Sequence, residues 1–208
     1  MKKFLAFALL GLAAVTASAE KADAAKQAVI NYDTLETNEV TQVTILTGNV
    51  VVTKGTLILK SDRATIKETP EGDMFVTLTA SAGKAATFRQ KRDGGPDLWI
   101  EGQAQRIEYD ERNDMMKLFS HAKIRQLEGQ KSTNEIESEF ISYDSRKEVF
   151  LARNDASGIN KPGQGQGTMV IAPRKPRAAP AAPPGAAAPV PAPVPAPAPT
   201  TTPAAGTQ

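Results

Sequence analysis

The chain has 208 residues, with 25 lysines and arginines against 23 aspartates and glutamates, one histidine and no cysteine. A chain without cysteine has no disulfide framework, and a single histidine argues against a transition-metal site, so we expect no metal and no other cofactor. Nucleic-acid binding requires a basic surface. The near balance of acidic and basic residues gives no sign of one, so no nucleic-acid partner is expected.

The N-terminus has the order of a secretory signal peptide. Lys2 and Lys3 precede an apolar run over residues 4–15, and Ala17-Ser18-Ala19 then supplies a cleavage site of small residues. The apolar run is shorter than the roughly 18–20 residues that span a bilayer. We expect residues 1–19 to be removed by cleavage after Ala19 and the mature protein to be exported.

Residues 20–172 are expected to form one folded domain. Runs rich in Val, Ile, Thr and Phe alternate there with turn residues, which predicts strands. Pro70-Glu71-Gly72-Asp73 and Asp93-Gly94-Gly95-Pro96 are expected hairpin loops, and Thr47-Gly48-Asn49 and Lys54-Gly55 are expected corners. The expected strands are residues 28–32, 42–46, 49–54, 56–60, 63–68, 74–79, 86–91, 97–101, 105–109, 115–119, 122–127, 135–143, 148–151 and 168–171. Many short antiparallel strands predict an all-β sandwich, barrel or jelly roll.

Apolar and polar side chains alternate along these runs, so the sheet should have one dry face and one wet face. The dry positions are Val50, Val52, Leu57, Leu59, Ala64, Ile66, Val76, Leu78, Ala80, Ile107, Tyr109, Ala122 and Ile124. The wet positions are Lys60, Arg63, Thr65, Lys67, Arg106, Glu108, Lys123 and Arg125.

One short phrase, Ile-x-Tyr-Asp, occurs at Ile30, at Ile107 and at Ile141. Residues two apart share a strand face, and aspartate favours a turn, so each copy predicts an inward Ile and Tyr followed by a turn. In addition, the stretch that begins at Leu46 aligns with the stretch that begins at Leu118. Repetition on this scale indicates stacked copies of one hairpin-sized unit.

The C-terminal region, residues 173–208, contains 12 of the 15 prolines among Ala, Val and Thr. Such a composition predicts an extended, disordered Pro/Ala-rich tail. A passive spacer is the simplest interpretation, and a peptide ligand or a cell-wall contact is the alternative.

Catalytic motifs are missing from the sequence, so we do not expect an enzyme. Ser120 and His121 are adjacent, and on a strand adjacent side chains point to opposite faces. We find no Gly-rich phosphate loop, no spacing of metal ligands and no paired carboxylates in the context of a pocket.

Several segments of the sequence resemble those of a known family. Leu46-Thr47-Gly48-Asn49-Val50 and Leu57-Ile58-Leu59-Lys60-Ser61-Asp62-Arg63-Ala64 resemble the repeat of the OstA-like family. Lys84-Ala85-Ala86-Thr87-Phe88 and Gly102-Gln103-Ala104-Gln105-Arg106-Ile107-Glu108-Tyr109 resemble its middle segment. The resemblance covers roughly residues 28–151. The departures from the family pattern are Ser120-His121 in place of Gly-Asn, a longer loop around residues 128–134, and the tail.

The resemblance implies a half-open antiparallel β-jelly roll with an apolar interior that binds the lipid A part of lipopolysaccharide in the periplasm. It also implies head-to-tail stacking of the protein with itself through edge strands. The resulting bridge would join an inner-membrane LptC-like anchor to an outer-membrane LptD-like transporter.

The residues expected to line the lipid-binding interior are Ile30, Val50, Val52, Leu57, Leu59, Phe88, Ile107, Tyr109, Leu118, Ile124 and Tyr143. For any one of Val50, Leu57, Leu59, Ile107 and Ile124, plain core packing is at least as good an interpretation. Phe88, Tyr109 and Tyr143 are better candidates for the mouth of the trough, because a tyrosine hydroxyl favours a wet edge and Phe88 offers a large apolar contact.

Two other interpretations stay open. One is a self-assembling periplasmic β-scaffold that carries no lipid, and the other is an anchored, LptC-like member of the same family. The cleavage site at Ala17-Ser18-Ala19 argues against the anchored version.

Overall fold

The structure is a computed structural model that describes residue 23 and residues 26–95 and 97–173. The predicted signal peptide, residues 1–19, lies outside the described residues, and so does the predicted tail apart from Pro173.

The described chain is an all-β, half-open antiparallel jelly roll of twelve strands. The strands are β1 (Ala28–Asn31), β2 (Thr34–Asn38), β3 (Val43–Lys54), β4 (Leu57–Glu68), β5 (Met74–Thr79), β6 (Ala86–Lys91), β7 (Leu98–Ala104), β8 (Arg106–Asp110), β9 (Met115–Glu128), β10 (Lys131–Asp144), β11 (Val149–Arg153) and β12 (Thr168–Ile171). No helix in the described part of the chain is long and apolar enough to cross a membrane.

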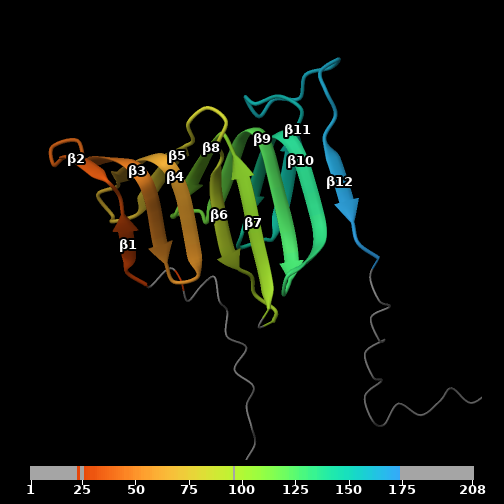
Figure 1. The fold of residues 1–208 in the computed structure, drawn as a ribbon, viewed down its shortest axis with the longest axis horizontal. Coiled ribbons are helices and arrows are strands. Elements are labelled where there is room, and N and C mark those ends of the chain that lie inside the picture. Colours follow the sequence, from red (N-terminus) through yellow and green to blue (C-terminus); the bar gives the residue numbers. More distant parts are fainter. Residues whose placement is uncertain (1–22, 24–25, 96, 174–208) are drawn as a thin grey trace, which may run out of the picture. The chain divides into compact units, whose positions relative to one another are not determined.

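Four long strands, β3, β4, β9 and β10, each belong to two layers. The first half of β3 pairs with β2 and its second half with β1, and β4 pairs with β6 and then with β5 in the same way. β9 pairs with β8 and then β7, and β10 pairs with β12 and then β11. The jelly roll is therefore one sheet folded over, as Figure 1 shows with β6 and β7 in front of β8.

We call the two halves the first and second layers. The first layer consists of β2, residues 43–47 of β3, residues 63–68 of β4, β5, β8, residues 115–119 of β9, residues 140–144 of β10, and β11. The second layer consists of β1, residues 50–54 of β3, residues 57–61 of β4, β6, β7, residues 122–128 of β9, residues 131–138 of β10, and β12.

The bends that separate the layers coincide with left-handed backbone in two of the long strands. In β3 the φ angles of Gly48 and Asn49 are +79° and +45°, and in β9 those of Ser120 and His121 are +62° and +54°. The side chain of Asp33 occupies the space where a Cβ of residue 48 would lie, so that position requires glycine. The predicted corner at Thr47-Gly48-Asn49 is thus a bend with a register shift inside one continuous strand.

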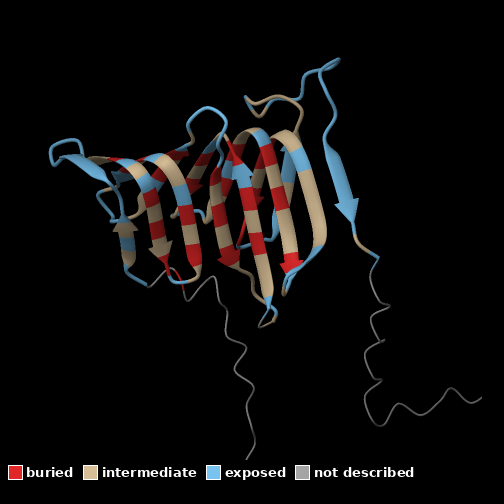
Figure 2. Ribbon diagram, in the orientation of Figure 1, coloured by how far each residue is buried: buried red, intermediate tan, exposed pale blue. Residues whose placement is uncertain are grey.

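The core lies between the layers, where the dry faces of both meet. Figure 2 shows buried and more exposed residues alternating along the strands, as the period of two requires. Every predicted dry position is buried except Ala80, which is half-buried and packs against the core. None of the predicted wet positions is buried.

Three local predictions are wrong. Tyr32 is 43% exposed rather than inward, because β1 ends at Asn31 and the chain turns at Asp33, whose backbone N–H donates to the carbonyls of Thr47 and Gly48. Strand β2 was not expected. The expected loop at residues 128–134 is instead a tight turn, since β9 continues to Glu128 and β10 begins at Lys131.

Gly102 on β7 has no side chain, and this leaves room in the core for the aromatic ring of Phe88. The two residues are directly opposite on paired strands. A Cβ at Gly102 would lie 2.4 Å from Phe88 Cε1 and 3.0 Å from both Leu118 Cδ2 and the backbone oxygen of Lys123. The ring therefore fills the volume that a side chain at residue 102 would take.

We expect Gly102→Ala to lower the free energy of unfolding by about 1–3 kcal/mol, because an added methyl overfills a packed core. Urea denaturation measures this. Gly165→Ala is the matched control: an added Cβ there meets no atom within 4 Å, so its stability should change by less than about 0.5 kcal/mol. Equal stability of Gly102→Ala and the wild type would contradict this account of the core.

Candidate functional site

The candidate site is the apolar interior between the two layers. The structure brings all of the residues predicted to line it into one cluster. Each is at most 8% exposed, apart from the half-buried Ile30, which packs against the others. They are Ile30, Val50, Val52, Leu57, Leu59, Phe88, Ile107, Tyr109, Leu118, Ile124 and Tyr143. In this state the interior is filled by the protein's own side chains.

The aromatic residues expected at a mouth are inside this cluster instead. Phe88 and Tyr143 are 1% and 0% exposed, and the Tyr143 ring stacks on Phe150 with 4.6 Å between centroids. Tyr109 is also buried, and burial raises the pKa of its hydroxyl well above the ordinary value, with the charge of Asp114 adding to the rise. A tyrosine two residues after an inward isoleucine lies on the same dry face of the strand, so its ring is buried in the core.

An apolar cavity of about 170 Å³ opens beside β12, at the end of the layers where β10 and β11 lie. This volume is below the roughly 300–1,000 Å³ typical of small-molecule sites. The lining residues are Ile124, Gln126, Asn134, Ile136, Phe150 and Met169. Of these, only Ile124 was a predicted lining residue. Extending the alternation of β10 back from Ile136 places Asn134 on the inward face. The sequence predicted a loop over residues 128–134, so this signal was not used.

Opposite the bends, the strands of both layers end along a line that we call the seam. On the second layer it consists of residues 54–57, 91–95, 97–98 and 128–131, and on the first layer of residues 68–74, 110–115 and 144–149. Two ion pairs between described residues cross it. Lys54 Nζ, at the end of β3, bonds Glu111 Oε1 after β8, and Arg92 Nη2, after β6, lies 2.8 Å from Glu148 Oε1, before β11.

The first of these pairs is shielded from solvent. The side chains of Lys54 and Glu111 are only 11% and 12% exposed, and Glu111 Oε2 also accepts the backbone N–H of Met74 at 2.9 Å. Removing one partner of such a pair leaves the other buried without compensation, which is strongly destabilising. The Arg92 pair is more exposed on the Glu148 side, at 43%, and is correspondingly weaker.

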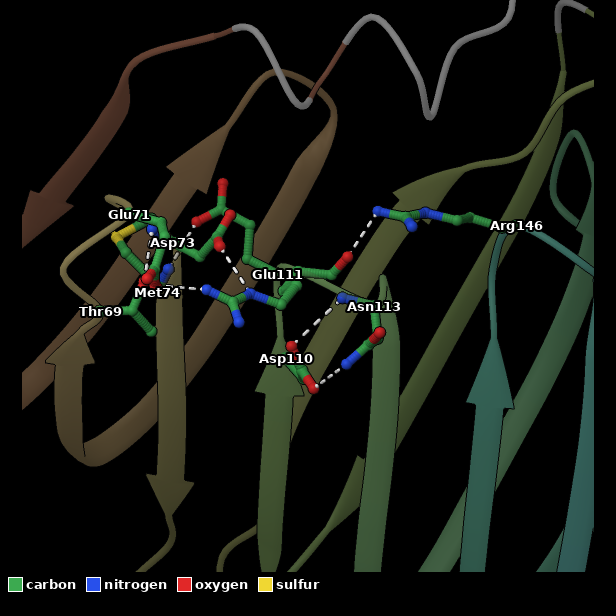
Figure 3. Close-up of polar contacts among 9 residues, drawn as sticks. Thr69, Glu71, Asp73, Met74, Asp110, Glu111, Asn113 and Arg146 are labelled. Atoms are coloured by element: carbon green, nitrogen blue, oxygen red, sulfur yellow. Dashed lines mark hydrogen bonds and ion pairs between the residues drawn. The ribbon is translucent and has the colours of Figure 1, made fainter.

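The loops of the first layer are bonded to one another along the seam (Figure 3). Arg112 donates from Nε to Asp73 at 2.8 Å and from Nη2 to Glu71 at 2.5 Å, and this guanidinium holds the pKa of Glu71 below its ordinary value. Arg146 then donates to the backbone oxygen of Arg112 at 2.7 Å. These bonds join the loops after β4, β8 and β10 into one rim.

The strands at both ends of the sheet have unpaired edges in the described structure. β1 and β2 each pair only with β3, and β11 and β12 each pair only with β10. Large apolar side chains are exposed on or next to these strands, namely Val29, Tyr32, Leu35, Val149, Leu151, Met169, Val170 and Ile171. Unpaired edges with exposed apolar side chains favour pairing with another chain.

Titratable side chains among the described residues are the groups that could take part in other chemistry. No group of three or more His, Cys, Asp or Glu side chains in the described part of the chain could hold a metal ion. Ser120 and His121 lie at the bend of β9, where the His121 imidazole, 79% exposed, is 3.5 Å from Glu139.

Comparisons with known proteins agree on one family. The family model described as "LptA/(LptD N-terminal domain) LPS transport protein" matches residues 29–149. The lipopolysaccharide export system protein LptA of Haemophilus influenzae is 27% identical over 171 residues, which cover 82% of this chain and 91% of the relative. The lipopolysaccharide export system protein LptH of Pseudomonas aeruginosa is 30% identical over 147 residues, covering 70% of this chain and 79% of the relative.

A solved structure has the same fold. The crystal structure of Pseudomonas aeruginosa LptH, described as the LptA-homologous periplasmic component of the lipopolysaccharide transport device, aligns with a TM-score of 0.63 at 24% identity. The alignment covers 73% of this chain and 99% of that one. The resemblance to the OstA-like family is thereby confirmed, and this chain belongs to the family of LptA and the LptD N-terminal domain, the LPS transport proteins.

Proposed function

We propose that this protein carries lipopolysaccharide through the periplasm, with the acyl chains of lipid A held between the two layers. The observation that carries the proposal is the continuous apolar interior, which extends through both layers and reaches the cavity beside β12. Relatives are named as lipopolysaccharide export proteins, which supports lipopolysaccharide as the ligand. LptH is described as periplasmic, which supports the periplasm as the location.

The energetic reason for such a carrier is the length of an acyl chain. Exposing about a dozen methylenes to water costs on the order of 10 kcal/mol, at roughly 0.8 kcal/mol per methylene. Lipid A has several such chains, so transfer through water needs a continuous apolar path. A sheet folded over its dry face provides one without any catalytic group.

Because the interior is already filled, an acyl chain can enter only if the layers move apart. We propose that they separate at the seam and pivot about the bends. Separation exposes apolar side chains of both layers, and an inserted chain covers them again, so the burial lost is largely regained. The Lys54–Glu111 and Arg92–Glu148 pairs are then polar contacts that opening must break.

The unpaired edges support a bridge as well as a carrier. A second copy adding β1 and β2 to β11 and β12 would continue both layers, which is the strand-addition mode of recognition. The same mode would join the ends of the stack to an LptC-like anchor and an LptD-like transporter. A scaffold without lipid uses the same edges, and lipopolysaccharide binding by the purified monomer separates the two functions.

Photo-crosslinking tests the lipid path. We expect a benzoylphenylalanine in place of Phe150, which lines the cavity, to give a lipopolysaccharide adduct in growing cells. The same group in place of Leu151, the exposed neighbour on β11, should give none. A lipid adduct at both positions, or at neither, would count against an interior path.

Locking the seam tests the opening. The chain has no cysteine, so Lys54→Cys with Glu111→Cys introduces the only two thiols, which a short bismaleimide can join. We expect the joined protein to bind lipopolysaccharide at least about tenfold more weakly than the same variant capped with N-ethylmaleimide, since ~1.4 kcal/mol of resisted opening has that effect.

A matched control joins two cysteines within one layer. The hydroxyls of Thr37 and Thr44 are 3.0 Å apart on β2 and β3, so Thr37→Cys with Thr44→Cys leaves the seam free and should bind like its capped form. Undiminished binding by the protein joined across the seam would exclude opening as the route.

A further inference from the structure

Two amide side chains face the otherwise apolar cavity beside β12. Gln126 on β9 and Asn134 on β10 are register partners, and Asn134 Nδ2 donates to Gln126 Oε1 at 2.6 Å. The remaining lining comes from Ile124, Ile136, Phe150 and Met169. Polar side chains are thus placed where the alternation of both strands puts apolar ones.

The second polar atom of Asn134 is unsatisfied. Its Oδ1 is buried, and no described residue donates a hydrogen bond to it. A buried polar atom without a partner destabilises a protein, and such atoms are rare enough that each needs an explanation. A buried water typically makes about three hydrogen bonds, and the other walls of this cavity are aliphatic, aromatic or thioether groups.

We propose that Asn134 Oδ1 accepts a hydrogen bond from a hydroxyl group on an acyl chain that enters the cavity. Asn134 would then be a specificity-determining residue, selecting hydroxylated over plain acyl chains. The inference rests on the proposed function, because it assumes that acyl chains reach the interior.

The chemistry of the cavity favours a hydroxyl over other donors. Aliphatic and aromatic walls suit the chain itself, and one unpaired acceptor suits one donor. An amide N–H would bring a carbonyl that needs a donor of its own, and a charged donor would be costly to bury among these side chains. A chain without a hydroxyl would leave Oδ1 unpaired when it fills the cavity, and a site built for a hydrogen bond rejects such an analogue.

The test compares two synthetic glucosamine lipids that are identical except that one carries 3-hydroxytetradecanoyl chains and the other tetradecanoyl chains. Their dissociation constants are measured with the monomeric protein by displacement of a fluorescent acyl probe. We expect the wild type to bind the hydroxylated lipid about tenfold more tightly, the effect of one net hydrogen bond to a buried acceptor.

Asn134→Leu should bring this ratio to about one while binding of the plain lipid stays equal or becomes tighter. The double variant Gln126→Leu/Asn134→Leu removes both amides, so that neither is left unpaired, and it should behave in the same way if the single variant folds poorly. Gln103→Leu adds the same side chain at an exposed position of β7 and should keep the wild-type ratio.

A wild type without the preference overturns the inference, and so does a preference that survives in both leucine variants. These results leave the carrier function standing, because the lipids still bind. Failure of the wild type to bind either lipid would instead refute the carrier function, and the inference with it.

Discussion

Burial of apolar side chains between two layers that share their strands is the interaction on which the rest of this structure depends. The chain has no cysteine, so no disulfide holds the layers together. β3, β4, β9 and β10 run through both layers, so the layers stay joined at the bends whatever happens at the seam. Alternation along each strand directs apolar side chains inward from both layers. The same burial closes the open side at the seam, where the described residues add the Lys54–Glu111 and Arg92–Glu148 ion pairs.

This arrangement makes the core and the proposed binding surface one set of residues. A protein whose ligand occupies a separate pocket can keep its core closed, whereas here the ligand would take the place of one layer's contact with the other. Tight packing of the two layers against each other would then compete with insertion of an acyl chain between them. Residues such as Val50 and Leu59 would contribute to stability and to binding in alternation, which is a direct form of the trade-off between stability and function.

Periodicity in the sequence was sufficient to predict the dry face and most strands. The bounds of β5, β6 and β12 agree with the structure, because each is a single run of one period between clear turn residues. β2 was missed because Leu35 is its only large apolar residue and is itself 43% exposed. β2 forms because it lies beside β3 at the edge of the sheet, and the composition of residues 34–38 does not reveal that position.

Features that depend on folding the sheet over itself were not predictable in this way. The phrase containing Tyr143 gives the side of the strand on which the ring lies, but not its depth between two layers, so the ring was assigned to a mouth. Lys54 and Glu111 are far apart in sequence and meet only because the layers close on each other. Asn134 falls in a predicted loop, because a polar residue at an inward position breaks the alternation that identifies a strand.

The two bends also explain why the repeat is imperfect. At Gly48 the side chain of Asp33 folds over the bend, and only glycine leaves room for it. Over the equivalent bend in β9, the backbone N–H of His121 faces the carboxylate of Glu139 on the neighbouring strand. Glycine is therefore required at residue 48, while the second bend accommodates Ser-His at the same kind of backbone conformation.

The positions of the two seam pairs have a geometric consequence. Lys54 lies on β3, near the first edge of its layer, yet its partner follows β8, well along the other layer. Arg92 after β6 is likewise paired with Glu148, which directly precedes the edge strand β11. Facing strands are therefore displaced along the sheet, as expected when both layers have the usual twist. In a head-to-tail stack the twist of successive subunits would add up, so that the seams of the stacked subunits would follow a helical path around the filament. Lipid headgroups on successive subunits would then project in different directions.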